Sequence, residues 1–598
     1  MRETNQPLPA LGDIPRPEYP RPIMTRPNWL NLNGLWQFKA DPDQVGQAQA
    51  WPQKLPAPSV INVPFAPGTK ASGAECPEDC QSVWYERALP ELAWSSEETL
   101  LHIGASDHAT TIWINGQHVA DHRGGYAPIT VNIQPFFKTA NNRIVVRVND
   151  TRSWQQPRGK QAGDTRWPID YDPIIGIWQT VWLEPAPSVR INGIHYRYDL
   201  AQQNLTIITR LSKHTDAEIE IEITDPTGQV LCVRTSAQGR SEASQTIQIP
   251  RPRLWHPQDP YLYSVKIRLL DDGAEQDCVE SYTGLRSLAV ADQNILLNGE
   301  PLYLRGILDQ GYFPDGWYTA TTDDELKKDI ELTLELGFNL ARKHQKFEDP
   351  RYLYWADQLG LMVWNEMPSG RIFSQALIAD LTDEWMALIH RDQAHPCVIG
   401  WVPFNESWGL WHQSTRGEQR HFADAIYHLT KALDPTRPVI TNDGWEYSTG
   451  DYWTLHLYET TAETLQNRLA SLTGNPAQSI HDGPNPRAGA LAGADPSHLP
   501  LLLTECGGIG LVADSEADQG DAFFYGDMPK DTAAFLSRTA ELLNAIDATP
   551  RLRGFVWTQL TDVQQEINGL LDFQRQPKVP LQTLRHLIEQ TGLGRPIP

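Results

Sequence analysis

Two carboxylic acids, Glu406 and Glu505, each close a short apolar stretch of the sequence. Glu406 follows Asn405 in WVPFNESWG, and Glu505 lies in LLLTECGG. Cleavage of a glycosidic bond needs two such groups, because one protonates the leaving oxygen while the other attacks the sugar or activates a water. The residue types therefore favour a retaining or an inverting glycosidase, provided that the fold brings the two side chains together.

The surroundings of Glu406 suit a general acid. Trp401 and Trp408 flank it, and an acid in weakly hydrated aromatic surroundings has a raised pKa, as proton donation near neutrality requires. Asn405 could donate a hydrogen bond to the sugar hydroxyl beside the anomeric carbon. The alternative for Glu406 is a structural acid paired with an arginine, and the alternative for Glu505 is a carboxylate at a helix entry.

Other residues at strand ends extend this set. Glu366 in LMVWNEMPSG also follows an asparagine and competes for the catalytic role. An arginine keeps a neighbouring carboxylate ionised, and an indole ring can form a floor for a sugar ring. Residues of these types end the neighbouring apolar runs: Arg342, His344, His456, Tyr458 and Trp557. Taken alone, each is more often a core or surface residue than a ligand-binding one.

The elements that must position these residues begin after residue 288, where apolar strands alternate with helical segments. The strand candidates are PLYLRGI, FNLARKH, LMVWNEMP, VIGWVPFNE, PVITND, WTLHLY, LPLLLTE and GFVWTQL. Eight strands separated by helices predict a (β/α)8 TIM barrel, which keeps its chemistry at the carboxyl ends of its strands. Glu406 then ends strand four and Glu505 ends strand seven, so both face the same mouth.

One helix of this barrel is predicted in detail. TDDELKKDIELTLELG, residues 322–337, begins with a capping box of Thr322 and Glu325 and carries apolar residues at helical spacing. Gly337 is expected to end it, because glycine accepts the left-handed backbone that terminates helices.

The first half of the chain is predicted to be all β. Residues from about 27 to 186 form short alternating runs such as TTIWING and RIVVRVND, separated by turn residues, which is typical of a β-sandwich. AEIEIEITD and YLYSVKIRLL continue the pattern on the scale of an immunoglobulin-like sandwich. The expected domains are 1–186, an N-terminal tail and first sandwich; 187–287, an immunoglobulin-like sandwich; and 288–598, the barrel.

The amino-acid composition disfavours some classes of binding partner. The chain has 598 residues, enough for several domains, and a formal net charge of −24. Such an acidic balance disfavours nucleic acid and anionic membranes. We find neither a secretory signal nor a long apolar run, and therefore expect a soluble cytoplasmic protein. The oligomeric state is open, and a homo-oligomer is one alternative.

The cysteines do not form a metal-binding framework. Of six, Cys76 and Cys80 in CPEDC are close enough to bridge or to share a metal, but two local ligands are half the usual set. We expect a loop there, no metal and no organic cofactor. Two longer loops, 466–499 and 507–530, are expected to complete the mouth of the barrel, and the second contains the aromatic run of Phe523, Phe524 and Tyr525.

Taken together, the motifs resemble glycoside hydrolase family 2, the family of β-galactosidases, β-glucuronidases and β-mannosidases. The resemblance spans nearly the whole chain, through LNGLWQFK, VWYER, WINGQHV, GIWQTVWLEP, LWHPQDPYLY, NGEPLYLRG, FNLARKH, FNESWG, TECGG and WTQLTDVQQEINGLLDFQRQPK. It implies a sugar-binding-type jelly roll for the first sandwich. By the same resemblance Glu406 would be the acid/base and Glu505 the nucleophile of a retaining enzyme, and Glu366 would have a supporting role.

Departures from the family pattern concern the substrate. Arg342 is followed by KHQKF where galactosidases and glucuronidases tend to have R-x-S-H-Y-P, and the Asn-x-Lys pair of glucuronidases is replaced by Asn568, Gly569 and Leu570. A uronic acid is thus disfavoured. In galactosidases an acid from the first sandwich reads sugar hydroxyls, and here WPIDYDPIIG offers Asp170, with Asp172 as the alternative.

The resulting hypothesis is a retaining exo-β-glycosidase for β-D-galactosides, with a carbohydrate as its partner. The alternatives are another activity of the family, namely α-L-arabinosidase, β-galactofuranosidase or β-glucuronidase, or a carbohydrate-binding protein whose barrel is inactive.

Overall fold

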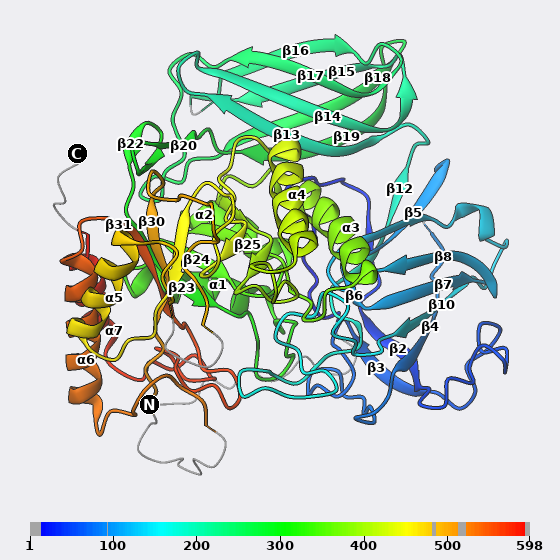
Figure 1. The fold of residues 1–598 in the computed structure, drawn as a ribbon. Coiled ribbons are helices and arrows are strands. Elements are labelled where there is room, and N and C mark those ends of the chain that lie inside the picture. The colour runs from blue at the N-terminus through cyan, green and yellow to red at the C-terminus, as the bar shows by residue number, and fades with distance from the viewer. Residues whose placement is uncertain (1–13, 93, 226, 481–485, 512–521, 593–598) are drawn as a thin grey trace.

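Three bodies follow one another along the chain, and Figure 1 shows two β-sandwiches and a barrel of parallel strands and helices. The computed structural model describes residues 14–92, 94–225, 227–480, 486–511 and 522–592. In Figure 1 the first sandwich is blue to cyan at the right, the second lies at the top, and the barrel runs from green to red. The predicted class, two β-sandwiches followed by a TIM barrel, is confirmed.

The first sandwich packs a sheet of four strands on a sheet of six. The smaller sheet has the order β1 (Leu30–Asn31), β12 (Val181–Ala186), β5 (Glu98–Ile103) and β9 (Ile129–Asn132). The larger has the order β3 (Ser59–Val63), β2 (Gly34–Ala40), β4 (Ser82–Ala88), β10 (Arg143–Asn149), β7 (Ala109–Ile114) and β8 (Gln117–Arg123). A separate short pair joins β6 (Ser106–Asp107) to β11 (Gly176–Ile177). Buried aliphatic and aromatic side chains, Trp36 and Tyr85 among them, fill the space between the sheets.

The second sandwich has three strands against four. Its sheets have the orders β13 (Ile191–Asp199), β14 (Asn204–Thr215), β17 (Arg240–Gln248), and β16 (Val230–Ser236), β15 (Glu218–Thr224), β18 (Tyr263–Asp271), β19 (Ala274–Thr283). The alternation in AEIEIEITD places Ile219, Ile221 and Ile223 in the core, as period-two patterning requires. A small sheet of β20 (Leu288–Ala291), β21 (Asn294–Leu297) and β22 (Glu300–Pro301) leads into the barrel.

Seven parallel strands form the curled sheet of the barrel. Their order is β26 (Val398–Val402), β25 (Met362–Glu366), β24 (Leu340–Lys343), β23 (Leu304–Asp309), β31 (Leu552–Thr558), β30 (Leu501–Gly507) and β29 (Trp453–His456). The helices are α1 (Asp323–Glu335), α2 (Pro350–Leu359), α3 (Gln375–Asp392), α4 (Gly417–Leu433), α5 (Ala462–Gly474), α6 (Thr532–Asp547) and α7 (Leu581–Gln590), and a short 3-10 helix, Gln134–Phe136, lies in the first sandwich.

The sheet closes through its shortest strand. Within the predicted fifth strand, only β28 (Asn442–Asp443) forms a ladder, in parallel with β27 (Phe404–Asn405). On its other side the amide of His456 donates to the carbonyl of Gly444 at 3.4 Å. The barrel therefore closes beside the residues predicted to carry the chemistry.

Helix α1 bears out its predicted ends. The Thr322 hydroxyl accepts a hydrogen bond from the amide of Glu325, and the Glu325 carboxylate accepts one from the amide of Thr321. Gly337 has a φ of +92° directly after the helix, in the region that favours glycine.

The prediction that residues 466–499 form a loop was wrong for its first part, because these residues continue helix α5. Thr461 caps the helix by accepting from the amide of Thr464, and Leu465, Leu469 and Leu472 are buried at helical spacing. Small and polar residues between these leucines gave the stretch the composition of a loop. Residues 481–485 of this stretch and 512–521 of the other expected loop lie outside the described residues.

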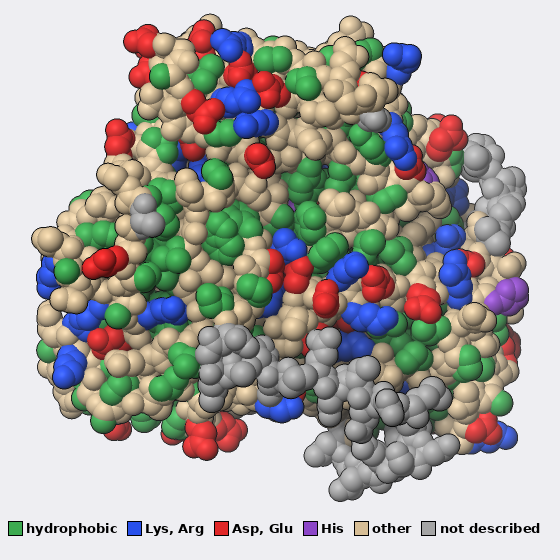
Figure 2. Space-filling view, turned by 180° about the vertical axis from the view of Figure 1, so that it is seen from behind, with side chains coloured by type: hydrophobic (Ala, Val, Ile, Leu, Met, Phe, Trp, Pro, Cys, Tyr) green, Lys and Arg blue, Asp and Glu red, His purple; other side chains and the backbone are tan. Residues whose placement is uncertain are grey.

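Acidic and basic side chains are interspersed on the face of the molecule shown in Figure 2, with hydrophobic side chains scattered between them. Among the helices in the described part of the chain, we find none that combines the length and the apolar character needed to cross a bilayer. The six cysteines are free thiols, and Cys76 and Cys80 lie in the predicted loop.

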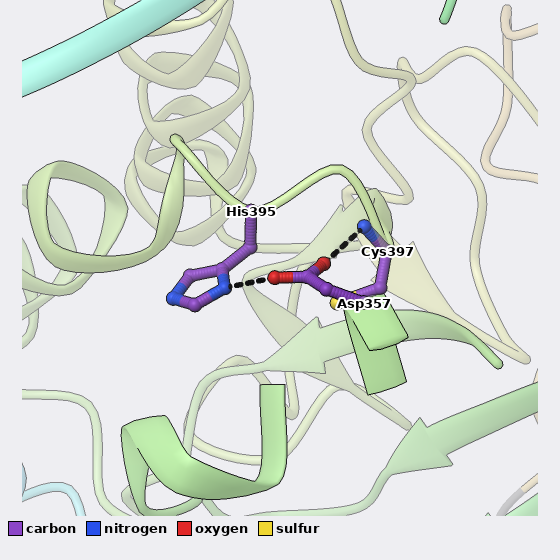
Figure 3. A group of neighbouring side chains, drawn as sticks. All are labelled: Asp357, His395 and Cys397. Carbon is purple, nitrogen blue, oxygen red and sulfur yellow. Dashed lines mark hydrogen bonds and ion pairs between the residues drawn. The ribbon is translucent and has the colours of Figure 1, made fainter. Parts of the chain in front are cut away.

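A buried carboxylate joins the second sandwich to the barrel. Asp357 of α2 accepts hydrogen bonds from Tyr282 Oη of β19 at 2.9 Å and from the amide of Cys397 at 2.8 Å, and its carboxylate lies 2.5 Å from His395 Nδ1 (Figure 3). The His395 nitrogen is too close to the carboxylate for an ion between them. Because an unsatisfied buried polar group costs about 1–3 kcal/mol, this cluster fixes how the two bodies meet.

Candidate active site

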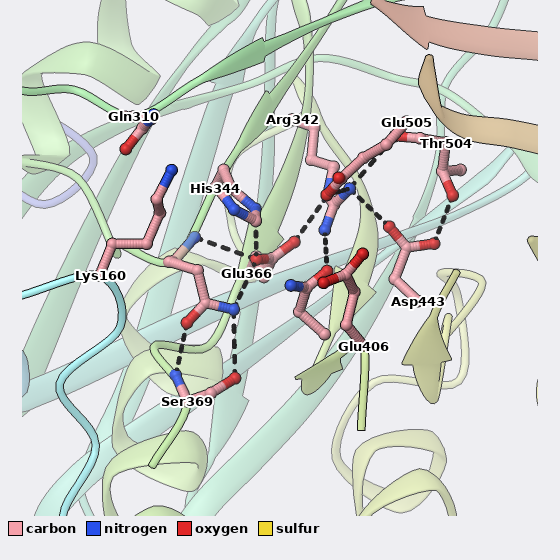
Figure 4. A network of polar contacts seen from close by, with 12 residues as sticks. Lys160, Gln310, Arg342, His344, Glu366, Ser369, Glu406, Asp443, Thr504 and Glu505 are labelled. Carbon is pink, nitrogen blue, oxygen red and sulfur yellow. Dashed lines mark hydrogen bonds and ion pairs between the residues drawn. The ribbon is translucent and has the colours of Figure 1, made fainter. Parts of the chain in front are cut away.

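Most of the predicted site residues meet at the carboxyl ends of the barrel strands, and Figure 4 shows Arg342, Glu366, Glu406 and Glu505 there. Arg342 lies in β24, Glu366 ends β25, Asn405 ends β27, His456 ends β29, and Glu505 lies in β30. Carboxyl ends of parallel strands share one face of a barrel, so residues far apart in the sequence come within contact distance.

Arg342 is the centre of this cluster. Its guanidinium is fully buried, and its nitrogens lie 2.6 Å from Glu366, 2.8 Å from Asp443 and 2.9 Å from Glu505. The guanidinium also donates to the side-chain oxygen of Asn405 at 2.6 Å. Burial of one cation beside three acids is stable only because each acid provides an acceptor in good geometry.

Glu505 is held in its ionised form. Tyr458 donates to it at 2.6 Å, and Arg342 donates to its other oxygen. Burial alone would raise the pKa of this carboxyl, but the positive charges of His456 and Arg342 outweigh burial and hold the pKa below its usual value. A carboxylate that stays charged while almost fully buried is suited to attack an electrophilic carbon.

Glu406 has the opposite tendency. Burial and the negative charge of Glu505 raise the pKa of its carboxyl, and the hydrogen bond with His456 at 2.8 Å opposes this only in part. The side chain is 17% exposed, so a ligand can reach it. Two neighbouring carboxyls whose pKa values are pushed apart are the arrangement expected of an acid and a nucleophile.

The backbone around Glu406 is strained. Glu406 and Ser407 have φ values of +52° and +56°, which are uncommon for residues with a side chain. The Glu406 amide donates to the carbonyl of Asp443, and the Ser407 amide donates to the side chain of Asn442, both at 2.9 Å. Strain of this kind persists where surrounding contacts fix it, and it is concentrated at functional sites.

His456 lies between the acids as a cation. Burial would lower its pKa, but the charges of Glu505 and Asp443 raise the pKa to about 10. Its Nδ1 faces Glu406 and its Nε2 lies 3.2 Å from Asp443, so both ring N–H groups have acceptors when the ring is protonated. The imidazolium therefore carries charge near the pair rather than exchanging protons near neutrality.

Glu406, His456 and Glu505 each place one potential ligand atom within 4.8 Å of those of the other two. A carboxylate oxygen of Glu406 therefore lies within 4.8 Å of a carboxylate oxygen of Glu505. The same three atoms form a potential cation site. The positive charges of His456 and Arg342 disfavour a metal ion there, because a cation would have to displace the proton of His456.

Three further predicted residues line this network. The side-chain NH2 of Asn405 is buried and has no hydrogen-bond partner among the described residues. Glu366 is bonded to Arg342 and accepts from the Gln345 amide at 3.0 Å, and His344 Nδ1 lies 2.9 Å from it. Glu366 thus has its acceptors occupied, whereas the free N–H group of Asn405 is available to a ligand.

Aromatic residues close one side of the mouth. Trp557 lies over Gly507, where a Cβ atom would stand 2.4 Å from the indole. Tyr458 stacks on Tyr525 with ring centroids 3.4 Å apart, and Phe523 meets Tyr525 edge on at 5.2 Å. The 507–530 loop therefore reaches the site through Tyr525, which stacks on Tyr458, and Tyr458 donates to Glu505.

Asp170 lies in a different contact from the predicted one. Both of its carboxylate oxygens bind Arg371, at 2.5 and 3.1 Å, and one also accepts from the amide of Trp167. Within the described residues it makes no hydrogen bond or ion pair to Glu406 or Glu505. Asp172 instead pairs with Arg166 at 2.6 Å.

The first sandwich does reach the mouth, through Lys160. Gly159 has a φ of +63°, and a Cβ atom there would meet the Gln345 carbonyl at 2.3 Å, so only glycine fits. Lys160 follows and pairs with Glu566 at 2.5 Å, and Gln310 donates to the same carboxylate at 2.8 Å. Figure 4 shows Lys160 and Gln310 beside His344.

Sequence reasoning missed Asp443, Lys160 and Glu566. Asp443 ends a predicted strand, and its position was a usable signal. Lys160 and Glu566 lie in loops with no periodic pattern, and only the packing of the first sandwich on the barrel brings them together.

Comparison with known families matches three consecutive segments. Residues 30–187 match the family model "Glycosyl hydrolases family 2, sugar binding domain", residues 189–286 match "Glycosyl hydrolases family 2", and residues 288–480 match "Glycosyl hydrolases family 2, TIM barrel domain".

Similar proteins include β-glucuronidases and a β-galactosidase. The chain is 27% identical over 489 residues to a β-glucuronidase of Sus scrofa, covering 72% of this chain and 71% of that one. It is 27% identical over 433 residues to a β-galactosidase of Thermoanaerobacter pseudethanolicus, covering 69% and 55%. The structure of a β-glucuronidase from Ruminococcus gnavus in complex with D-glucuronic acid superposes with a TM-score of 0.79 at 19% identity, covering 96% of this chain and 100% of that chain, which shows the shared fold.

Proposed function

The chain belongs to glycosyl hydrolase family 2, and from that premise we propose that it is a retaining exo-β-glycosidase in which Glu406 is the acid/base and Glu505 the nucleophile. The observation that carries the proposal is the close approach of the two carboxylates, combined with the opposite directions in which their pKa values are shifted.

The reaction takes two displacements. In the first, Glu406 gives its proton to the glycosidic oxygen, the bond from this oxygen to the anomeric carbon breaks, and Glu505 forms an ester with that carbon. In the second, Glu406 takes a proton from water, the water oxygen attacks the anomeric carbon, and the ester bond returns its electrons to Glu505. Two inversions give net retention.

Neighbouring residues support each half of this cycle. Arg342, Tyr458 and His456 keep Glu505 ionised before the attack. The unpartnered NH2 of Asn405 is positioned to donate to the sugar hydroxyl next to the anomeric carbon. Such a bond contributes to catalysis where it strengthens in the transition state.

For the sugar, we propose a neutral hexopyranoside, with β-D-galactosides first. Lys160 is a cation at the mouth that could bind a uronic carboxylate, but it is paired with Glu566 at 2.5 Å, and Gln310 donates to the Glu566 carboxylate at 2.8 Å. An incoming carboxylate would have to displace Glu566 and leave a buried charge unpaired, which is costly.

The second candidate is a β-glucuronidase. It is favoured by several relatives that carry that name, and by the presence of Lys160 at the mouth. In this case Glu566 would yield to the substrate, and Lys160 would bind the uronic carboxylate.

A panel of nitrophenyl β-glycosides separates the two. Cleavage of the galactoside with little turnover of the glucuronide supports the first proposal; an untouched galactoside beside a cleaved glucuronide or arabinoside overturns it. Glu566→Gln provides the matched variant, because it frees Lys160 without changing shape. If Glu566 excludes uronides, this variant raises kcat/KM for the glucuronide relative to the galactoside, and Lys160→Met does not.

A further inference from the structure

A cavity of about 320 Å³ lies where the three bodies of the molecule meet, away from the barrel mouth. Strands β5, β9 and β12 of the first sandwich, strands β13 and β14 of the second, and the ends of helices α2 and α3 all contribute to its lining. Its volume is within the range of small-molecule sites.

The lining is rich in arginine. Five arginines line this cavity: Arg21, Arg26, Arg190, Arg210 and Arg391. One carboxylate, that of Asp349, also lines it and is paired with Arg16 at 3.1 Å. Like charges gathered in a partly buried space repel one another, and such an arrangement is stable only with counter-charges or a bound anion.

Counter-charges are present for four of the five, and Arg26 is paired with both Glu184 and Asp277. Arg21 pairs with Glu184, Arg190 with Glu98 at 2.6 Å, and Arg391 with the neighbouring Asp392 at 2.6 Å. Arg21, Arg190 and Arg391 nevertheless each keep one buried side-chain nitrogen without a hydrogen-bond partner among the described residues. The Arg391 side chain is only 7% exposed, so water cannot easily satisfy its free Nη1.

Arg210 has no ion-pair partner of this kind in the described part of the chain, and the negative charge of Glu242 acts on it without a direct contact. Its guanidinium makes no ion pair or hydrogen bond with any residue in the described ranges, although Glu242 is its cross-strand neighbour in the sheet. The side chain lies over Gly193 of β13, where a Cβ atom would stand 2.6 Å from its Nη2. A β-bulge between Ile191 and Gly193 opens the strand at this point.

Gly193 therefore leaves the space that the Arg210 side chain occupies. With any other residue at position 193 the guanidinium would be pushed away from this path. His390 at the end of α3 also lines the cavity, and burial together with the charge of Arg210 lowers its pKa to about 4. His390 is thus neutral near pH 7 and can hydrogen-bond a ligand without adding charge.

We propose that this cavity binds a small oxyanion, the carboxylate or phosphate group of a metabolite, with Arg210 and Arg391 as its principal ligands. A planar guanidinium binds either group through paired N–H donors, which is why arginine is common at such sites. The proposal is independent of the sugar that the barrel cleaves.

The test is a calorimetric titration of the full chain at low ionic strength with inorganic phosphate and, separately, with citrate. Saturable binding of either supports the site, and the anion that binds tells a phosphate site from a carboxylate site. Arg210→Met keeps the length of the stem and is expected to weaken binding about tenfold or more, since it removes a charge-assisted contact.

Two controls keep the result decisive. Arg234→Met removes an arginine of the same sandwich that is 57% exposed and should leave the affinity unchanged. Arg210→Lys keeps the charge and should retain part of the affinity. The proposal is overturned if neither anion binds the wild-type chain beyond a sodium chloride control of equal ionic strength, or if Arg210→Met binds as well as wild type.

Discussion

Arg342 at the barrel mouth and Arg210 at the three-body cavity are both withdrawn from water, yet their surroundings are opposite. Arg342 is fully buried and forms ion pairs with Glu366, Asp443 and Glu505, whereas Arg210 is half-buried and forms no ion pair with a described residue, although Glu242 is its cross-strand neighbour. A cation with every donor occupied organises the groups around it. A cation with free N–H donors can instead bind an anion from solution.

The difference also sets what a substitution should do. At the mouth, removing a charge leaves its former partners buried and unpaired, so the loss of stability exceeds that of one contact. At the cavity, removing the charge relieves repulsion and costs nothing until a ligand is present. The predictions below test this contrast, beginning with the largest effect.

Replacing Glu505 by Gln should have the largest effect. The amide keeps the shape and can still accept from Tyr458, but it cannot form the covalent ester. We expect kcat to fall on the order of 10⁴- to 10⁶-fold, as for the loss of other enzymatic nucleophiles. Steady-state kinetics on the best substrate of the panel measures this, with Glu541→Gln on the exposed face of α6 as the control; unchanged turnover would exclude Glu505 as the nucleophile.

Replacing Arg342 by Met should damage both turnover and stability. Breaking a buried ion pair from one side costs about 3–5 kcal/mol, because the remaining charges are left unpaired. Urea unfolding measures the change. Arg234→Met should lie within about 0.5 kcal/mol of wild type, since the Arg234 side chain is 57% exposed and Arg268 stays paired with the same acid, Glu220. Equal stability of the two variants would refute the view of Arg342 as the centre of the site.

The pH dependence of activity tests the ionisation states assigned to Glu406, Glu505 and His456. A bell is expected for kcat/KM: activity rises as Glu505 ionises at its lowered pKa and falls as Glu406 loses its proton at its raised pKa. The charge of His456 lowers both values. His456→Asn should therefore move both limbs to higher pH, while His421→Asn on the exposed face of α4 leaves them in place. A shift to lower pH would contradict the assignment.

The smallest effect is expected at Arg210. Without added anion, Arg210→Met should unfold at the same urea concentration as wild type or at a slightly higher one, because an unpaired, partly buried charge is lost. Its turnover should equal that of the wild type. A marked loss of stability in the absence of an anion would mean that Arg210 is paired within the protein after all.

Much of this organisation was predictable from the sequence because it rests on local rules. The alternation in the sandwiches, the cap at Thr322 and the eight apolar runs each reflect a period or a hydrogen bond within a few residues. The meeting of Glu406, Glu505 and Arg342 followed from one topological fact, that parallel strands end on the same face.

What escaped prediction depends on contacts between bodies. Lys160 reaches Glu566 only because Gly159 lets the first sandwich press against the barrel, and Arg210 enters the cavity only because Gly193 leaves room for it. Asp170 binds Arg371 through both of its oxygens, and its contact with the sugar stays a prediction. No periodicity in the sequence encodes such pairings.

The central claim is that Glu406 and Glu505 act as an acid and a nucleophile through a covalent intermediate. Proton NMR of the first-formed sugar, recorded before mutarotation on the β-glycoside that the panel shows to be cleaved fastest, tests it most directly. Two displacements predict that the β-anomer appears first. Initial release of the α-anomer would show a single displacement by water and would contradict the account.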